Sequence, residues 1–233
     1  MRAEIKNLSK SQLKGRWGSA ILAFLVISSM GLVVNLVGEF IPIPMVSMLV
    51  MGATLFLGGV ITFGLSRFTL NFIDGRNEFT DIFSGFEYIL KATGLYAIQG
   101  IITIILIYIP MIIIIMFVAV TGSVGLIIPM ILIGVLGISI LVLAVNSIFS
   151  QSFFIFTEDP NKGIIECIKE SRELMKGRVG EYILLNLSFL GWGILVGFTF
   201  GLGGIFLIPY TNITYGNYYR RIRDEKESVE NFI

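Results

Sequence analysis

Charged residues are missing from four long stretches of the chain, and these stretches predict membrane helices. The uncharged windows run over residues 17–38, 40–66, 92–157 and 182–219. A helix that crosses a bilayer needs about 20 mostly apolar residues, at about 1.5 Å rise per residue. The first two windows therefore hold one crossing each, and the third must hold two, divided near Thr121-Gly122-Ser123.

The fourth window could form one long helix or two short helices hinged at residues 201–204, and the basic residues decide between them. All 17 Lys and Arg lie in four clusters, at residues 2–16, 67–91, 162–178 and 220–226. The positive-inside rule places such clusters in the cytoplasm. A single last crossing would put the fourth cluster outside, so we expect two short helices.

These assignments predict an all-α fold, a polytopic membrane helix bundle of about six transmembrane helices. Both termini are expected in the cytoplasm, and the protein is expected to cross the membrane several times. The predicted helices lie near residues 17–38, 46–70, 92–119, 125–151, 181–199 and 203–219.

Each predicted hairpin follows a segment with helical spacing of apolar residues, which would lie flat on the inner membrane surface. Two entries into the membrane are nearly the same, Lys14-Gly15-Arg16-Trp17-Gly18 and Lys176-Gly177-Arg178-Val179-Gly180, and Ser84-Gly85-Phe86 is a degenerate third. The alternative is that any membrane entry collects Lys, Arg and Gly for snorkelling and turning. Under the repeat hypothesis the single membrane domain consists of interfacial helix 1–16 with hairpin 17–70, interfacial helix 76–90 with hairpin 91–151, interfacial helix 163–177 with hairpin 181–219, and a cytoplasmic tail 220–233.

In the last three predicted helices, polar side chains lie at a similar depth near the inner surface. They are most frequent in the sixth predicted helix, after Pro209. Lipid cannot satisfy such groups, so they should face other helices or a wet cavity. The candidate polar cluster is Asn146, Gln151, Asn186, Tyr210, Asn212 and Tyr215. The cluster either lines a cytoplasm-facing pocket or only links helices, at about 0.6 kcal/mol per hydrogen bond.

Three glycines of the fifth predicted helix, Gly193, Gly197 and Gly201, repeat at four-residue spacing. Such a face lets a neighbouring backbone come close. Because a short hairpin joins the fifth and sixth helices, we expect these glycines to pack against the sixth helix rather than to form a homodimer.

The residue inventory removes several classes of chemistry. The chain has no His, and Cys167 is its single cysteine, which excludes intrachain disulfides, zinc sites of His and Cys, and His-based acid–base catalysis. We predict no catalytic residue, no metal site and no cofactor, and we do not expect an enzyme. The formal net charge of +1, with acids interleaved among the basic residues, argues against nucleic acid as a partner.

Several motifs are familiar: Leu13-Lys14-Gly15-Arg16-Trp17, Glu170-Ser171-Arg172-Glu173-Leu174-Met175-Lys176-Gly177, Leu187-Ser188-Phe189-Leu190-Gly191-Trp192, and Pro209-Tyr210 with Tyr218-Tyr219. Together they resemble the bacterial integral membrane proteins of domain of unknown function family 975. The resemblance implies a polytopic protein of a bacterial cytoplasmic membrane and brings no catalytic residues. Ser9 departs from it, because the family pattern leads us to expect alanine there.

Two functions remain open. The first is a non-catalytic membrane scaffold or accessory component, whose partners are the lipid bilayer and other membrane proteins or a bound lipid or peptide. The alternative is a permease or export component for a small amphipathic solute, peptide or lipid, and the polar half-helix after Pro209 supports it.

Overall fold

The computed structural model describes residues 2–40, 44–76, 78–121 and 127–230, and this part of the chain is helical with no strand. The all-α fold class is therefore confirmed. The elements are α1 (Arg2–Leu13), α2 (Trp17–Phe40), α3 (Pro44–Ile73), the 3₁₀ helix η1 (Phe79–Phe86), α4 (Ile89–Thr121), α5 (Ile127–Phe149), α6 (Ser152–Glu158), α7 (Ile164–Leu174), α8 (Val179–Leu187), α9 (Leu190–Phe198) and α10 (Gly204–Glu230).

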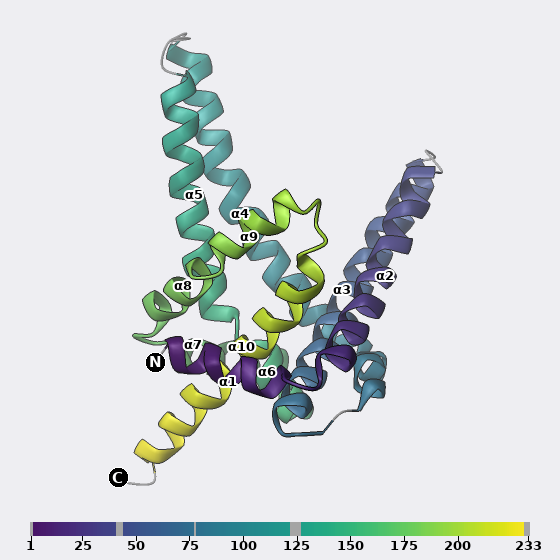
Figure 1. Ribbon diagram of the computed structural model, residues 1–233. Coiled ribbons are helices and arrows are strands. Elements are labelled where there is room, and N and C mark those ends of the chain that lie inside the picture. The colour runs from purple at the N-terminus through teal and green to yellow at the C-terminus, as the bar shows by residue number, and fades with distance from the viewer. Residues whose placement is uncertain (1, 41–43, 77, 122–126, 231–233) are drawn as a thin grey trace.

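The helices form two long hairpins and one shorter one, which rise from a common base (Figure 1). The long hairpins are α2 with α3 and α4 with α5, and they diverge as they leave the base. The shorter hairpin, α8 and α9 followed by α10, stands between them. The base contains α1, η1, α6, α7 and the C-terminal half of α10, and both chain ends lie on its side of the molecule.

An aromatic core fills the base, where α3, α6 and α10 meet. The ring of Phe63 lies 4.7 Å from that of Phe156, and Phe154 stacks on Tyr219 at 5.3 Å between ring centroids. By contrast, most side chains of α4 and α5 beyond the base are exposed. The base therefore packs as a soluble protein does, and the outer parts of the hairpins suit a lipid environment.

The two similar membrane entries form the same backbone corner. Gly15 and Gly177 both adopt a left-handed conformation, at φ 79° and 77°. In each corner the backbone N–H of the arginine donates to the backbone carbonyl three residues earlier, from Arg16 to Leu13 and from Arg178 to Met175. Glycine suits this conformation because it has no Cβ.

Four helical segments in the described ranges are long and apolar enough to cross a membrane, at residues 49–73, 89–120, 131–158 and 179–198. A fifth is reached if α1 and α2, bent by 97°, count as one span. The predicted number of about six is therefore not reached. The predicted sixth helix, 203–219, is missing from this set because polar and charged side chains interrupt the hydropathy of α10.

Two further expectations need correction. The segment predicted as an interfacial helix at 76–90 contains the 3₁₀ helix η1 rather than an α-helix. The predicted tail 220–233 is not separate, because α10 continues unbroken through residue 230, and residues 231–233 lie outside the described part. Gly122 and Ser123, at the predicted division between the third and fourth helices, also lie outside it.

Candidate functional site

The structure brings two residues of the predicted polar cluster together at the contact between α8 and α10. The Tyr215 hydroxyl donates to Asn186 Oδ1 at 2.8 Å, and Asn186 Nδ2 donates to the Tyr182 carbonyl at 2.8 Å. The Tyr182 ring packs beside those of Tyr215 and Tyr218. This contact joins the two sides of the short hairpin.

Asn146 belongs to a different contact, between α4 and α5. Its Oδ1 accepts from Thr103 Oγ1 at 3.0 Å, and nearby Gln99 Nε2 donates to the Phe149 carbonyl at 3.2 Å. These bonds link the two helices of the long hairpin where it leaves the base.

Gln151 is fully buried at the break between α5 and α6. Its backbone N–H donates to Ser171 Oγ at 3.3 Å, and Ser171 Oγ donates in turn to the Ile148 carbonyl at 2.7 Å. Gln151 Nε2 donates to Ser150 Oγ at 2.5 Å, while its Oε1 has no hydrogen-bond partner in the described ranges. This third contact fixes α7 beneath α5.

Tyr210 and Asn212 each lie apart from these contacts. The Tyr210 ring meets Phe189 edge-on at 5.5 Å, and Asn212 Nδ2 donates to the Ile208 carbonyl of its own helix at 2.9 Å. Of the six predicted residues only Asn186 and Tyr215 contact each other, and the structure does not gather the six into one pocket.

The predicted glycine face is not a helix contact. A Cβ added to Gly193 or Gly197 would meet no described atom within 4 Å, and Gly201 lies in the turn at φ 89°. Gly203, just before α10, instead faces Val196 of α9 and Thr199 just after it, each 3.1 Å from a Cβ built on Gly203. The four-residue spacing therefore identified a row of small residues, but it did not show whether that row faces a neighbouring helix.

Close backbone contacts occur at other glycines, between α3 and the segment η1–α4. A Cβ on Gly64 would lie 2.0 Å from the Ile82 carbonyl oxygen, and one on Gly85 would lie 2.0 Å from that of Val60. A Cβ on Gly59 would lie 2.5 Å from the Ala92 carbonyl oxygen. Gly85 belongs to the degenerate third entry motif, which was the sequence signal for this contact.

An ion-pair network centred on Glu158 is the main polar feature that sequence reasoning missed. Glu158, at the end of α6, pairs with Arg220 and Arg223 of α10, the latter at 2.5 Å, and accepts from the Tyr219 hydroxyl at 2.5 Å. Arg220 also pairs with Asp74 at 2.7 Å, just after α3. The spacing of Arg220, Arg223 and Glu227 along one face of a helix was the available signal.

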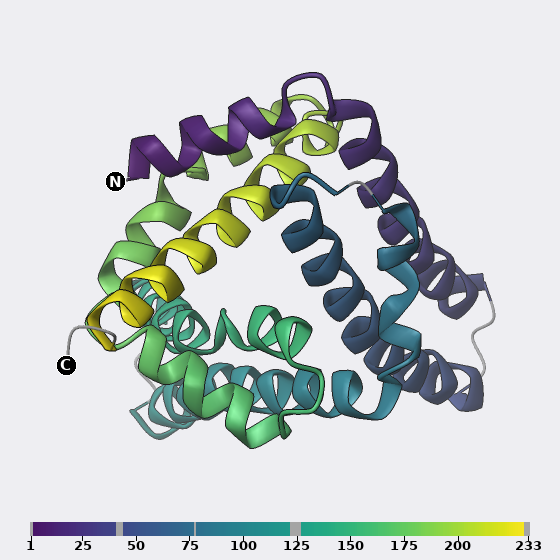
Figure 2. The same cartoon turned by 90° about the horizontal axis from the view of Figure 1, so that it is seen from below.

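The network extends to α7 and borders a polar crevice on the underside of the base. Glu170 accepts from Lys162 at 2.6 Å and lies 3.5 Å from Arg223. The crevice has a volume of about 670 Å³ and opens between α3, α6 and α10, which border the centre of the view from below (Figure 2). Its arginines are Arg67, Arg76, Arg220 and Arg223, and its acids are Glu158, Asp224 and Glu227.

A second polar link joins α1 to α10. Asn217 Nδ2 donates to Ser9 Oγ at 3.0 Å and to Gln12 Oε1 at 2.6 Å, and Ser9 Oγ donates to the Ile5 carbonyl at 2.8 Å. Ser9 is the residue at which the resemblance led us to expect alanine. Its hydroxyl here satisfies a buried amide, which alanine could not do.

Cys167 is buried in α7, and burial raises the pKa of its thiol to about 11. Because the thiolate is the reactive form, this environment makes the residue inert at neutral pH. Among the described residues no group of three or more His, Cys, Asp or Glu is arranged to hold a metal ion.

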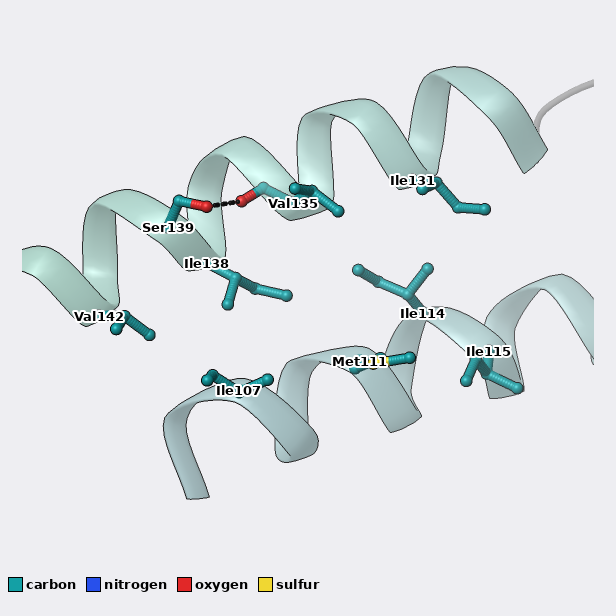
Figure 3. A pocket seen from close by; sticks show the side chains of 9 residues that line it. All are labelled: Ile107, Met111, Ile114, Ile115, Ile131, Val135, Ile138, Ser139 and Val142. Atoms are coloured by element: carbon teal, nitrogen blue, oxygen red, sulfur yellow. Dashed lines mark hydrogen bonds between the residues drawn. The ribbon is translucent and has the colours of Figure 1, made fainter. Parts of the chain in front are cut away.

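A gap of about 390 Å³ lies between α4 and α5 in the outer part of their hairpin (Figure 3). Eight of the nine side chains drawn around it are apolar, and the ninth, Ser139, donates to the Val135 carbonyl of its own helix at 2.7 Å. Its lining therefore presents no free polar group to orient a ligand.

This chain matches a protein family, but no individual curated protein or solved structure. One family model matched, over residues 1–226, which is nearly the whole chain and includes α1, every hairpin and the ion-paired base. The chain therefore belongs to the family described as "Protein of unknown function (DUF975)".

Proposed function

We propose that this protein is a non-catalytic component of a bacterial cytoplasmic membrane, a scaffold that holds its hairpins on a rigid base and presents their apolar sides to lipid and to other membrane proteins. The observation that carries the proposal is the set of ion pairs and hydrogen bonds that Glu158 forms with α10. One carboxylate contacts two arginines and a tyrosine hydroxyl of α10, and its side chain is only 18% exposed.

The same network supports a fixed arrangement of the hairpins. Arg220 bridges Glu158 to Asp74, which follows the first long hairpin, and Glu170 connects Arg223 to α7. Removing one member of a partly buried ion pair leaves the other charge unpaired, at a cost of several kcal/mol when the pair is fully buried. The base thus resists changes in the angles between the hairpins.

The orientation in the membrane follows from the placement of charge. The basic clusters lie at the base, on the same side as both termini, and the far ends of the hairpins point the other way (Figure 1). By the positive-inside rule the base faces the cytoplasm. In this arrangement α10 returns the chain to the base through the interior of the protein, where neighbouring helices rather than lipid meet its polar groups.

The alternative, a permease or export component, requires polar groups that line one continuous path. The contact of Asn186 with Tyr215 favours it, but the other polar side chains of the predicted cluster are engaged separately. We therefore favour the scaffold.

The test is photo-crosslinking in native membranes. A benzoylphenylalanine at Leu132, which is 66% exposed on α5, should capture one defined membrane protein at a fixed ratio, whereas the same group at the buried Leu185 should capture none. Glu158→Gln should reduce the capture severalfold, and Glu227→Gln, whose carboxylate is 58% exposed, should not.

Two results would overturn the proposal. One is capture of nothing but lipid at Leu132 and at other exposed hairpin positions. The other is movement of a small amphipathic solute or peptide by the purified protein in proteoliposomes, together with loss of that movement in Tyr215→Phe.

A further inference from the structure

A groove of about 560 Å³ opens where the corner between α1 and α2 meets α9 and α10. Its wall is mostly apolar and includes Leu195, Val196 and Phe206, and two cationic residues, Lys10 and Lys14, also line it. Both tryptophans of the chain, Trp17 and Trp192, also line it. The groove thus combines an apolar wall with a cationic end.

The cations at the rim have no negative partner. Among the described residues neither Lys10 nor Lys14 forms an ion pair with a carboxylate, whereas Lys162, Arg178, Arg220 and Arg223 all do. The Lys10 ammonium lies 5.8 Å from the centroid of the Tyr210 ring, which is part of the wall. The Lys10 ammonium therefore lies near an aromatic ring of the groove wall and not near a carboxylate.

The arrangement of α1 adds to this unbalanced charge. Arg2, Lys6 and Lys10 of α1 follow one another at four-residue spacing, and Lys14 comes just after the helix ends, so neighbouring charges lie close together and repel each other. Lys6 donates to the Ser188 carbonyl at 3.0 Å and lies 4.0 Å from the Phe189 ring, and its pKa is lowered by burial and then by the charge of Lys10. An anion beside Lys10 and Lys14 would relieve the repulsion.

The aromatic residues indicate the depth at which the groove lies. Trp17 packs edge-on against Phe206 at 5.9 Å, and Trp192 is half exposed. Indole side chains favour the boundary between headgroups and hydrocarbon. With the base at the cytoplasmic surface, the lysines reach the headgroup level and the wall extends into the acyl chains.

We propose that this groove binds an anionic phospholipid of the inner leaflet, with its phosphate between Lys10 and Lys14 and an acyl chain along α9 and α10. Basic pockets between membrane helices on the cytoplasmic side are suited to such headgroups. The proposal requires that the base lie at a membrane surface and does not depend on a scaffold role.

The position of the two tryptophans allows a direct test, because both line the groove and the sequence contains no other tryptophan. The protein is reconstituted in phosphatidylcholine nanodiscs that contain a small fraction of brominated phosphatidylglycerol or, in a parallel series, brominated phosphatidylcholine. Bromine quenches indole fluorescence on contact, so quenching measures which lipid occupies the groove. We expect brominated phosphatidylglycerol to quench more than brominated phosphatidylcholine at the same mole fraction.

Lys10→Gln with Lys14→Gln should remove this preference, lowering the relative affinity for the anionic lipid by roughly tenfold to thirtyfold. Lys169→Gln with Lys176→Gln removes two exposed charges, one on α7 and one in the turn after it, and should keep the preference, which separates the groove from general surface charge. Lys10→Arg with Lys14→Arg should also keep it.

Equal quenching by the two lipids in the wild-type protein would overturn the proposal. So would an undiminished preference in the glutamine variant, provided that circular dichroism and the thermal midpoint show that this variant is folded.

Discussion

The close approach of two helices in this protein depends on whether a residue at the contact carries a Cβ atom. A Cβ added to Gly64 would overlap the carbonyl oxygen of Ile82, whereas a Cβ added to Gly193 would meet no described atom. Both positions are glycines inside apolar helices, and only the contact partner differs. Local sequence around a glycine therefore does not reveal whether a helix contact requires it.

Gly64→Ala should destabilise the protein strongly, because the new methyl group would overlap a backbone oxygen that cannot rotate away. Overpacking of this kind costs about 1–3 kcal/mol or more. Gly193→Ala should cause no loss, since alanine favours a helix over glycine by up to about 1 kcal/mol. Thermal unfolding in detergent checks both variants, and equal midpoints would contradict the close contact of α3 with η1.

Tyr215→Phe should destabilise the short hairpin by about 1 kcal/mol, because it removes the hydrogen bond to Asn186 and leaves that amide oxygen without its donor. Asn212→Leu should change stability by less than about 0.5 kcal/mol, since Asn212 bonds only within its own helix. The free energy of unfolding in a denaturing detergent measures both. If Asn212→Leu proved the more damaging change, the separation of the polar residues into distinct contacts would be wrong.

Cys167 should react with iodoacetamide about 100-fold more slowly than an exposed thiol at pH 8, because burial raises its pKa from 9.0 to about 11 and so depletes the thiolate. Mass spectrometry of the folded and the denatured protein gives the two rates. Rapid modification of the folded protein would show that α7 opens readily from the base.

At the scale of elements, apolar composition predicted the long hairpins well. The third and fourth predicted helices, 92–119 and 125–151, differ by a few residues from α4 and α5. Length and hydropathy alone fix such helices, because lipid requires every backbone group to bond within the helix. Hydropathy does not show which neighbour each face of a helix contacts, and for that reason Asn146 was expected near the last helix but contacts Thr103 of α4.

The C-terminal end of α10 shows a second limit of predicting helices from the sequence. A span that ends at residue 219 and a separate tail were predicted, because charges begin at Arg220. The helix instead continues, since Arg221 pairs with Glu225 and Arg223 with Glu227 at i,i+4 spacing. A change from apolar to charged residues marks the membrane boundary and not the end of a helix.

The contact of the α10 extension with the base should weaken in acid. Arg178 and then Arg221 hydrogen-bond to Glu225 and hold the pKa of its carboxyl below the ordinary value of 4.5. A lowered pKa in the folded state stabilises it above pH 4.5, and the stabilisation is lost as the pH falls through the lowered value. Amide exchange of residues 220–229, corrected for intrinsic rates, should therefore stay nearly constant from about pH 6 to about pH 5 and accelerate as the pH falls below 4.5.

Glu225→Gln should make this exchange fast at pH 6 and nearly independent of pH. Asp224→Asn, an exposed position on the same turn, should leave the wild-type profile unchanged. Identical profiles for the wild-type protein and Glu225→Gln would rule out a role for this carboxylate.

At the scale of the whole molecule, charge distribution predicted an arrangement that hydropathy alone does not give. Four helical segments of the described chain qualify as spans, but the return of α10 to the base brings both termini to one side. The parity argument from basic residues reached the same placement of the termini relative to each other. It could not show that Thr214, Asn217 and Tyr218 of α10 are buried against other helices.

Cysteine labelling in intact cells tests the proposed orientation. With Cys167 replaced by serine, a cysteine at Val120, which is 84% exposed at the far end of α4, should react with a membrane-impermeant maleimide. A cysteine at the exposed Arg172 on α7 should react only after the cells are permeabilised. Labelling of the Arg172 position from outside would reverse the orientation and place the lipid groove in the outer leaflet.

The segregation of basic residues to the base has a consequence for biosynthesis. With the base in the cytoplasm, no lysine or arginine has to be translocated, and Glu39 at the end of α2 is the one ionised side chain that must pass to the other side. Moving a charged group through hydrocarbon is the main energetic obstacle to insertion. Each hairpin can therefore enter the bilayer as a pair while the ribosome is still making the next one, and the base can assemble only after the last hairpin has emerged.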